Sequence, residues 1–218
     1  MDEKKYLLVF DLDDTLYKEV DFLRSGYQYI CDKFLLDEHV FQQMLNDHFE
    51  GKNAFEELIR QHDLPLQLSE LIQLYHAHLP KISLDQATKY TLDVLSQTPF
   101  VELGLLTDGR STTQRNKLKA LGIENYFKEI IISEEFGSEK PNLANYLHFA
   151  NKYPNYHCFY IADNIQKDFV SPNQLAWTTI CLKDNGRNVH SQCLSVSSHF
   201  LPKHLITEMA ELISIIID

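Results

Sequence analysis

Short runs of consecutive hydrophobic residues recur along the chain, and longer amphipathic segments separate them. Such runs are typical of strands that are buried on both faces of a parallel sheet. Strands that alternate with helices predict an α/β fold with a doubly wound parallel sheet. The predicted strands are residues 6–10, 100–106, 130–132, 158–162 and 177–182, and the predicted helices are 111–121, 141–152, one opened by Ser171 and Pro172, and 202–217.

The segment from about residue 16 to residue 98 departs from this alternation, because it contains no convincing strand. Its hydrophobic residues recur at helical spacing instead; Phe22, Tyr29, Ile30 and Phe34 share one helical face. A crossover between parallel strands needs only one helix. The pattern therefore predicts an inserted helical subdomain over residues 18–87 and an α/β core formed by residues 1–17 and 88–218, with a helix near residues 84–97 returning to the core.

Composition and charge narrow the possible functions. The 218 residues include 20 basic and 31 acidic side chains, and the net charge of −11 disfavours binding to nucleic acid or to anionic lipid. The four cysteines form no C-x-x-C pair, so neither a zinc ribbon nor a thioredoxin-like site is indicated. No apolar stretch approaches the roughly 20 residues of a membrane span, and the first residues make a poor signal peptide. We expect a cytoplasmic protein, either a monomer or a homodimer.

Polar residues follow the predicted strands at the points where these strands end. In an open α/β sheet, ligands bind just beyond the carboxyl ends of the strands. Carboxylates that converge there repel one another unless a hard divalent cation lies among them, and an oxygen-only ligand set favours Mg²⁺. A lysine and a hydroxyl would complete a phosphate-sized pocket. These residues are Asp11 and Asp13 after the first strand, Thr107, Asp108 and Gly109 after the second, Lys140 after the third, and Asp163 and Asp168 after the fourth.

Four segments of the chain resemble the four motifs of the haloacid dehalogenase-like (HAD) hydrolases. They occur in that family's order, each at the end of a predicted strand. A lone D-x-D-x-T would be weak evidence, whereas four ordered motifs are strong. The segments are DLDDT at residues 11–15, LLTDGR at 105–110, EKP at 139–141 and ADNxxKD at 162–168.

The resemblance implies a role for each residue at the phosphate. Asp11 would be the nucleophile that forms an aspartyl-phosphate, and Asp13 would be the general acid and then the base. Asp13 must be protonated in order to donate, so we expect its surroundings to raise its pKa. Thr107 and Lys140 would hold phosphate oxygens. The backbone N–H groups of Leu12, Asp108 and Gly109 would contribute further hydrogen bonds to the phosphate.

The resemblance also implies a metal site and a cap. Mg²⁺ would be bound by Asp11, Asp163 and the backbone carbonyl of Asp13, with Asp168 supporting its outer shell. The helical insertion resembles the small helical cap of the family, which would close over the site and select the substrate. Tyr17 and Arg24 are candidates to reach the substrate from this cap.

The leading hypothesis is a Mg²⁺-dependent phosphatase that hydrolyses a small soluble phosphomonoester. Asp13 favours phosphate esters over halides, because a halide needs no proton to leave. Two alternatives stay open: a phosphomutase that uses the same aspartyl-phosphate, and a phosphate-responsive regulatory module. The sequence does not choose among a nucleotide, a sugar phosphate and a phosphorylated acid as the substrate.

Overall fold

A six-stranded parallel sheet forms the centre of the protein, seen in a computed structural model that describes residues 4–62 and 64–217. The strand order is β3-β2-β1-β4-β5-β6, so β1 lies in the middle and the chain continues to both sides of it. This is the predicted doubly wound α/β fold. The strands are β1 (Lys5–Phe10), β2 (Val101–Thr107), β3 (Glu129–Ile132), β4 (Tyr156–Ala162), β5 (Thr178–Leu182) and β6 (His204–Ile206).

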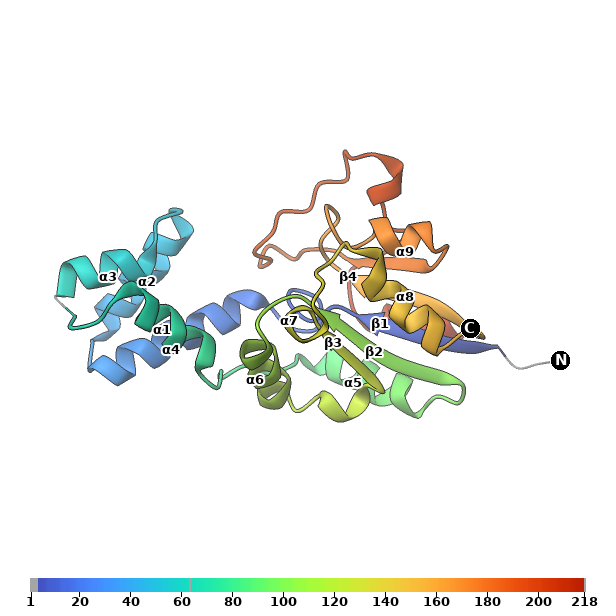
Figure 1. Ribbon diagram of the computed structural model, residues 1–218, viewed down its shortest axis with the longest axis horizontal. Helices are drawn as coiled ribbons and strands as arrows, with labels where there is room; N and C mark the ends of the chain where they lie inside the picture. The colour runs from blue at the N-terminus through green and yellow to red at the C-terminus, as the bar shows by residue number, and fades with distance from the viewer. Residues whose placement is uncertain (1–3, 63, 218) are drawn as a thin grey trace.

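Helices cover both faces of the sheet (Figure 1). Alternate residues of β1 point to opposite faces: Leu8 and Phe10 join one hydrophobic cluster, and Leu7 and Val9 join the other. The strand is buried on both sides, which explains why it is continuously apolar rather than alternating. The first face is covered by α5 (Gln86–Gln97), α6 (Ser111–Leu121) and α10 (Glu211–Ile217), and the second by α8 (Leu143–Lys152) and α9 (Val170–Gln174); α7 (Ser133–Phe136) follows β3.

Four helices between β1 and α5 form a bundle that projects from the sheet (Figure 1). They have a hydrophobic cluster of their own, in which Tyr27, Ile30, Met44, Leu58 and Leu71 are buried together. The bundle therefore has its own core, separate from the two clusters that flank the sheet. Its helices are α1 (Glu19–Phe34), α2 (Glu38–Phe49), α3 (Ala54–His62) and α4 (Leu68–Ala77).

The segment after β5 differs from the prediction. The helix expected over residues 202–217 is wrong in its first part, which forms β6, and only α10 is helical. His204 and Ile206 pair with Ile180 and Leu182. A helix as short as this segment would be marginally stable, whereas pairing with β5 gives its backbone groups hydrogen-bond partners.

Two helix starts are also displaced. Helix α8 begins at Leu143 with Asn142 as its N-cap rather than at Pro141, and Ser171 lies inside α9 instead of capping it. These shifts are of the size expected for helix ends and leave the order of elements unchanged.

The parallel arrangement brings the carboxyl ends of β1, β2 and β4 together at one edge of the sheet. The strand order reverses at β1, and a crevice at such a reversal is where open α/β sheets bind ligands. Within residues 4–62 and 64–217, no helix combines the length and the apolar character that crossing a bilayer requires.

Candidate active site

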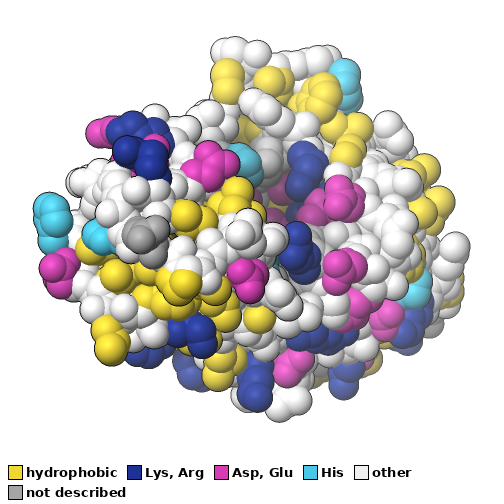
Figure 2. Space-filling model, turned by 60° about the vertical axis from the view of Figure 1, so that its left-hand side comes forward, with side chains coloured by type: hydrophobic (Ala, Val, Ile, Leu, Met, Phe, Trp, Pro, Cys, Tyr) yellow, Lys and Arg dark blue, Asp and Glu magenta, His cyan; other side chains and the backbone are white. Residues whose placement is uncertain are grey.

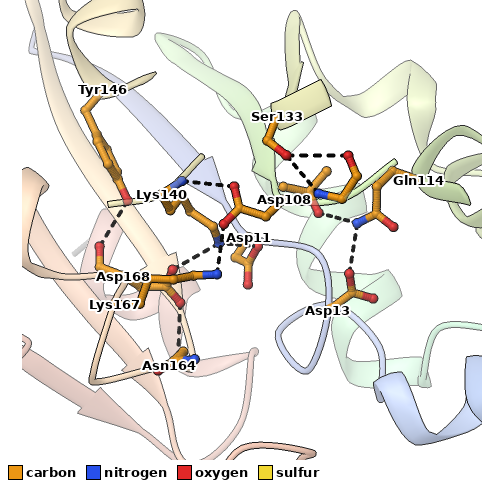
Figure 3. Close-up of polar contacts among 12 residues, drawn as sticks. Asp11, Asp13, Asp108, Gln114, Ser133, Lys140, Tyr146, Asn164, Lys167 and Asp168 are labelled. Atoms are coloured by element: carbon orange, nitrogen blue, oxygen red, sulfur yellow. Dashed lines mark hydrogen bonds and ion pairs between the residues drawn. The ribbon is translucent and has the colours of Figure 1, made fainter. Parts of the chain in front are cut away.

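A buried ion pair joins two of the predicted motifs beyond the carboxyl end of β1. Lys140 Nζ lies 2.7 Å from Asp11 Oδ1 and 3.0 Å from Asp168 Oδ1, and all three side chains are buried (Figure 3). Burial disfavours the charge on Lys140, but the carboxylates of Asp11 and Asp168 outweigh this effect and hold its pKa well above the usual value. Lys140 is therefore a permanent cation at the centre of the site.

Asp163 adds a third carboxylate to this group. Asp11, Asp163 and Asp168 each offer a ligand atom, and these atoms all lie within 4.8 Å of one another. Burial, opposed in part by Lys140, raises the pKa of Asp11 to about 7. Burial, followed by the negative charge of Asp11, raises the pKa of Asp163 to about 8. One lysine does not balance three buried carboxylates, so the cluster holds excess negative charge.

The loop after β2 positions Lys140 and shapes the phosphate-sized space. Asp108 Oδ1 accepts a hydrogen bond from the backbone N–H of Lys140 at 3.0 Å. Gly109 has a φ of 137°, a conformation that side-chain-bearing residues rarely adopt, and its N–H donates to Ser133 Oγ at 2.9 Å. Thr107 is buried at the end of β2, where its hydroxyl accepts a hydrogen bond from the Gln114 amide.

Asp13 lies apart from the three clustered carboxylates, on the side of Gln114 (Figure 3). Its Oδ1 is 2.7 Å from Lys117 Nζ and also accepts from the Tyr17 hydroxyl, and its Oδ2 accepts from Gln114 Nε2 at 2.9 Å. Burial acts to raise the pKa of Asp13, but the Lys117 ammonium and these hydrogen bonds outweigh burial and lower it. The expectation of a raised pKa is therefore wrong for this arrangement, because a buried lysine stabilises the carboxylate.

A cavity of about 170 Å³ lies between the end of the sheet and the start of α1, and the motif residues that line it are Asp11, Asp13, Asp14, Thr107, Asp108, Lys140, Asp163, Asn164 and Asp168. Figure 2 shows acidic and basic side chains gathered around a hollow in the surface. Glu19, Lys167 and His190 line the cavity together with the motif residues. Lys167 Nζ lies 2.8 Å from Asp108 Oδ2, so a second lysine stands near the mouth.

Three residues singled out in the sequence lie differently from the rest of the site. The Gly109 N–H, expected to bind the phosphate, donates to Ser133 Oγ instead, and Gly109 does not line the cavity. The Leu12 side chain is buried in the core, which leaves only its backbone to meet a ligand. Arg24 is exposed on α1, with its guanidinium 5.5 Å from the centre of the Phe41 ring, and does not line the cavity. Tyr17, by contrast, reaches the site through Asp13.

Gln114 and Lys117 were missed by the sequence reasoning. Both side chains are buried, although they lie on a helix that otherwise turns apolar residues such as Leu118 toward the core. The sequence signal that could have identified them is their separation by three residues. This separation places both on one face of α6, the helix that follows Thr107, Asp108 and Gly109.

The donor chemistry of the site suits a hard divalent cation and a phosphate. Its three clustered carboxylates supply only oxygen ligands, and Lys140 alone does not balance their charge when all three are ionised. Lys140 and Thr107 stand at the same cavity as a cation and a hydroxyl. Asp11 lines the same cavity, and a carboxylate is one of the side chains that can act as a nucleophile.

Comparison with known proteins agrees with this geometry. Residues 8–180 match the family model described as haloacid dehalogenase-like hydrolase. The chain belongs to this family, as the four motifs indicated. Its family is one of hydrolases, and its relatives include proteins named as a glyceraldehyde 3-phosphate phosphatase and a pyrophosphatase.

Three similar proteins illustrate the range of the resemblance. A glyceraldehyde 3-phosphate phosphatase of Methanocaldococcus jannaschii is 27% identical over 191 residues, which cover 79% of this chain and 82% of the relative. The crystal structure of YfnB from Bacillus subtilis, bound to magnesium, covers 99% of this chain and 100% of its own, with a TM-score of 0.71 at 19% identity. A HAD phosphatase from Thermococcus onnurineus covers 96% and 97%, with a TM-score of 0.62 at 20% identity.

The buried ion pair leads to a prediction about stability. In metal-free protein at pH 7.5, Lys140→Met should lower the free energy of unfolding by about 3–5 kcal/mol, because it leaves two buried carboxylates without their cation. The loss should be smaller at pH 5.5, since Asp11, with a pKa of about 7, is then mostly protonated and depends less on Lys140. Denaturant unfolding in the presence of a chelator measures both values.

Lys167→Met is the matched control, because it removes a lysine from a more exposed ion pair with Asp108. It should cost less than about 1 kcal/mol at either pH. Equal costs for the two substitutions at pH 7.5 would contradict the role given to Lys140.

Proposed function

We propose that this protein is a Mg²⁺-dependent phosphatase that hydrolyses a small phosphate ester through an aspartyl-phosphate on Asp11. The observation that carries the proposal is the Asp11 carboxylate, paired with Lys140 at 2.7 Å and clustered with Asp163 and Asp168 in a cavity. The surrounding cations and hydroxyl suit a phosphate, and a carboxylate beside them can attack it.

In the first step, an Asp11 oxygen forms a bond to phosphorus and the bond between phosphorus and the ester oxygen breaks. The electron pair leaves with the ester oxygen, which takes a proton from Asp13. Lys140 and Thr107 hold the phosphate oxygens, and Lys140 offsets the charge of the approaching nucleophile. The products of this step are an alcohol and the aspartyl-phosphate.

In the second step, water attacks the same phosphorus and gives its proton to Asp13, now a carboxylate. The bond between phosphorus and Asp11 breaks, which releases inorganic phosphate and restores the free Asp11 carboxylate. Asp13 must turn from Lys117 toward the ester oxygen to serve in either step, and it must gain a proton before the first step, because here it is a carboxylate paired with that lysine. The reaction thus includes a reorientation of Asp13.

Mg²⁺ is the cation proposed for the cluster, held by Asp11, Asp163 and the Asp13 backbone carbonyl, with Asp168 beside them. When bound, it supplies positive charge that stabilises the developing charge on the phosphate. Asp168 also keeps Lys140 in place through the 3.0 Å contact, and its Oδ2 accepts from the Asn164 N–H at 3.1 Å.

We also propose that residues 18–87 act as the cap and that residues 1–17 and 88–218 form the catalytic core. The separate hydrophobic cluster of α1–α4 supports this division. The returning end of the bundle rests on α6, where Asn116 Nδ2 donates to the carbonyl oxygens of Ala77 and His78 at 3.0 and 3.2 Å. Helix α6 therefore contacts both the cap and Asp13. The relative named for glyceraldehyde 3-phosphate makes a triose phosphate the first substrate to test.

The first prediction of this proposal concerns turnover. Purified protein should release phosphate from triose phosphates and from an aryl phosphate in the presence of Mg²⁺, and excess chelator should abolish this release. Asp11→Asn should reduce kcat at least about 1,000-fold, because the nucleophile is lost while the charge of Lys140 remains. A phosphate-release assay over a metabolite panel, reported as kcat/KM, measures both effects.

Product analysis of the same reactions separates the alternatives. An isomeric phosphate ester in place of free phosphate would indicate a phosphomutase, and a stable phosphorylated Asp11 without product release would indicate a regulatory module. Folded protein that binds Mg²⁺ and turns over nothing in the panel would refute the phosphatase proposal.

The second prediction concerns pH. The dissociation constant for Mg²⁺ should rise more than about tenfold from pH 8 to pH 6, because protons bind Asp11 and Asp163 in competition with the cation. Their pKa values of about 7 and 8 place the change in this window: both groups are protonated below it. Calorimetric titration measures the constants, and Asp163→Asn should flatten the dependence. Equal affinity at the two pH values would count against the assignment.

A further inference from the structure

The loop after β5 reaches the acidic cluster from outside the segment that matches the family model, which ends at residue 180. In this loop, Asn188 Nδ2 donates to Asp163 Oδ2 at 2.9 Å, and Asn188 Oδ1 accepts from Lys18 Nζ at 2.6 Å. A carboxylate can only accept and an ammonium can only donate, so these partners determine which way the amide faces. The Asn188 side chain therefore links Asp163 to the residue that precedes α1.

Hydrogen bonds on both sides hold the backbone of the loop in place. Asp184 Oδ1 accepts from the N–H groups of Gly186, Arg187 and Asn188 at 2.8, 3.0 and 3.0 Å. On the other side, the Val189 N–H donates to Asp14 Oδ2 at 2.7 Å. These hydrogen bonds fix the backbone on both sides of Asn188 and thereby hold its side chain against Asp163.

A second side chain of the same loop contacts the backbone at Asp163. Gln192 Nε2 donates to the Asp163 carbonyl oxygen at 2.8 Å and to the Leu182 carbonyl oxygen at 2.8 Å. Gln192 therefore anchors the strand ends on which Asp163 stands, while Asn188 contacts the carboxylate itself. The two contacts together restrict both the backbone and the side chain of Asp163.

We propose that Asn188 is a positioning residue for the metal, acting through Asp163. The proposal rests on the proposed function, because it assumes that Asp163 binds Mg²⁺. Carboxylates that bind metals are themselves hydrogen-bonded, and loss of such an outer partner commonly weakens metal binding by about 10- to 100-fold. A hydrogen bond from Asn188 to one oxygen orients the carboxylate and leaves its second oxygen for the cation.

A neutral amide suits this position for an electrostatic reason. A lysine that contacted Asp163 directly would compete with the metal for the carboxylate, and another carboxylate would add repulsion to a cluster already in excess of negative charge. Asn188 satisfies one carboxylate oxygen without either effect. Lys18 binds the carbonyl oxygen of this amide, at the end that faces away from Asp163.

The test is a Mg²⁺ titration of the full-length protein by calorimetry, so that binding is measured without turnover. Asn188→Ala should raise the dissociation constant for Mg²⁺ by about 10- to 100-fold. Half-maximal activation should move to higher Mg²⁺ by a similar factor, whereas kcat at saturating Mg²⁺ should stay within about threefold of wild type, because no reacting group is lost. Asn185→Ala, an exposed position in the same loop, is the matched control and should bind like wild type.

Two further variants separate positioning from loop stability. Lys18→Met should weaken Mg²⁺ binding by a smaller factor, since it frees the amide without removing the donor. In an Asp163→Asn background, Asn188→Ala should have no further effect, because the two residues act through one contact. In the metal-free protein, Asn188→Ala should lower the melting temperature by only a few degrees relative to Asn185→Ala, because it removes a hydrogen bond to Asp163.

The outcomes distinguish the two proposals. If wild-type protein binds Mg²⁺ and the dissociation constant of Asn188→Ala lies within about twofold of the wild-type value, the role of Asn188 is overturned. The phosphatase proposal would still stand. Failure of wild type to bind millimolar Mg²⁺ would overturn both. A weakening that persists in the Asp163→Asn background would show that Asn188 acts elsewhere and would also overturn this assignment.

Discussion

The placement of one buried lysine between carboxylates is the interaction on which the rest of the site depends. Lys140 Nζ lies 2.7 Å from Asp11 Oδ1 and 3.0 Å from Asp168 Oδ1. In the described part of the chain, no other cationic side chain forms an ion pair with these two carboxylates. Removing charge from water is costly, and only close pairing offsets the cost. The pairing is still incomplete, because Asp163 adds a third carboxylate. This excess negative charge is what a divalent cation would neutralise.

The fold supplies the positions that make such a cluster attainable. Parallel strands end at one edge of the sheet, so residues far apart in sequence, such as Asp11 and Asp163, meet after β1 and β4. These strands were predictable because they are buried on both faces and read as continuous apolar runs. Asp11, Asp108 and Asp163 were predictable for a related reason: each follows directly on such a run, where an open sheet binds its ligands.

What escaped prediction depends on contacts between distant segments. Lys117 looks like an ordinary polar residue of an amphipathic helix, yet it is buried against Asp13 and reverses the expected direction of that pKa. Strand β6 forms because β5 offers a free edge, which no local pattern reveals. Asn188 is one of several polar residues in a long loop, and only the folded chain brings it to Asp163. In each case the partner, and not the residue type, determines the role.

The central claim is that Asp11 carries the phosphoryl group in a site completed by Lys140, Thr107 and a bound metal. A crystal structure of the protein with Mg²⁺ and fluoroberyllate, which mimics an aspartyl-phosphate, tests it most directly. We expect beryllium bonded to an Asp11 oxygen, fluorides contacted by Lys140 and Thr107, and Mg²⁺ bound to Asp11 and Asp163. Fluoroberyllate bonded to another residue, or absent from Asp11 while Mg²⁺ is bound, would contradict it.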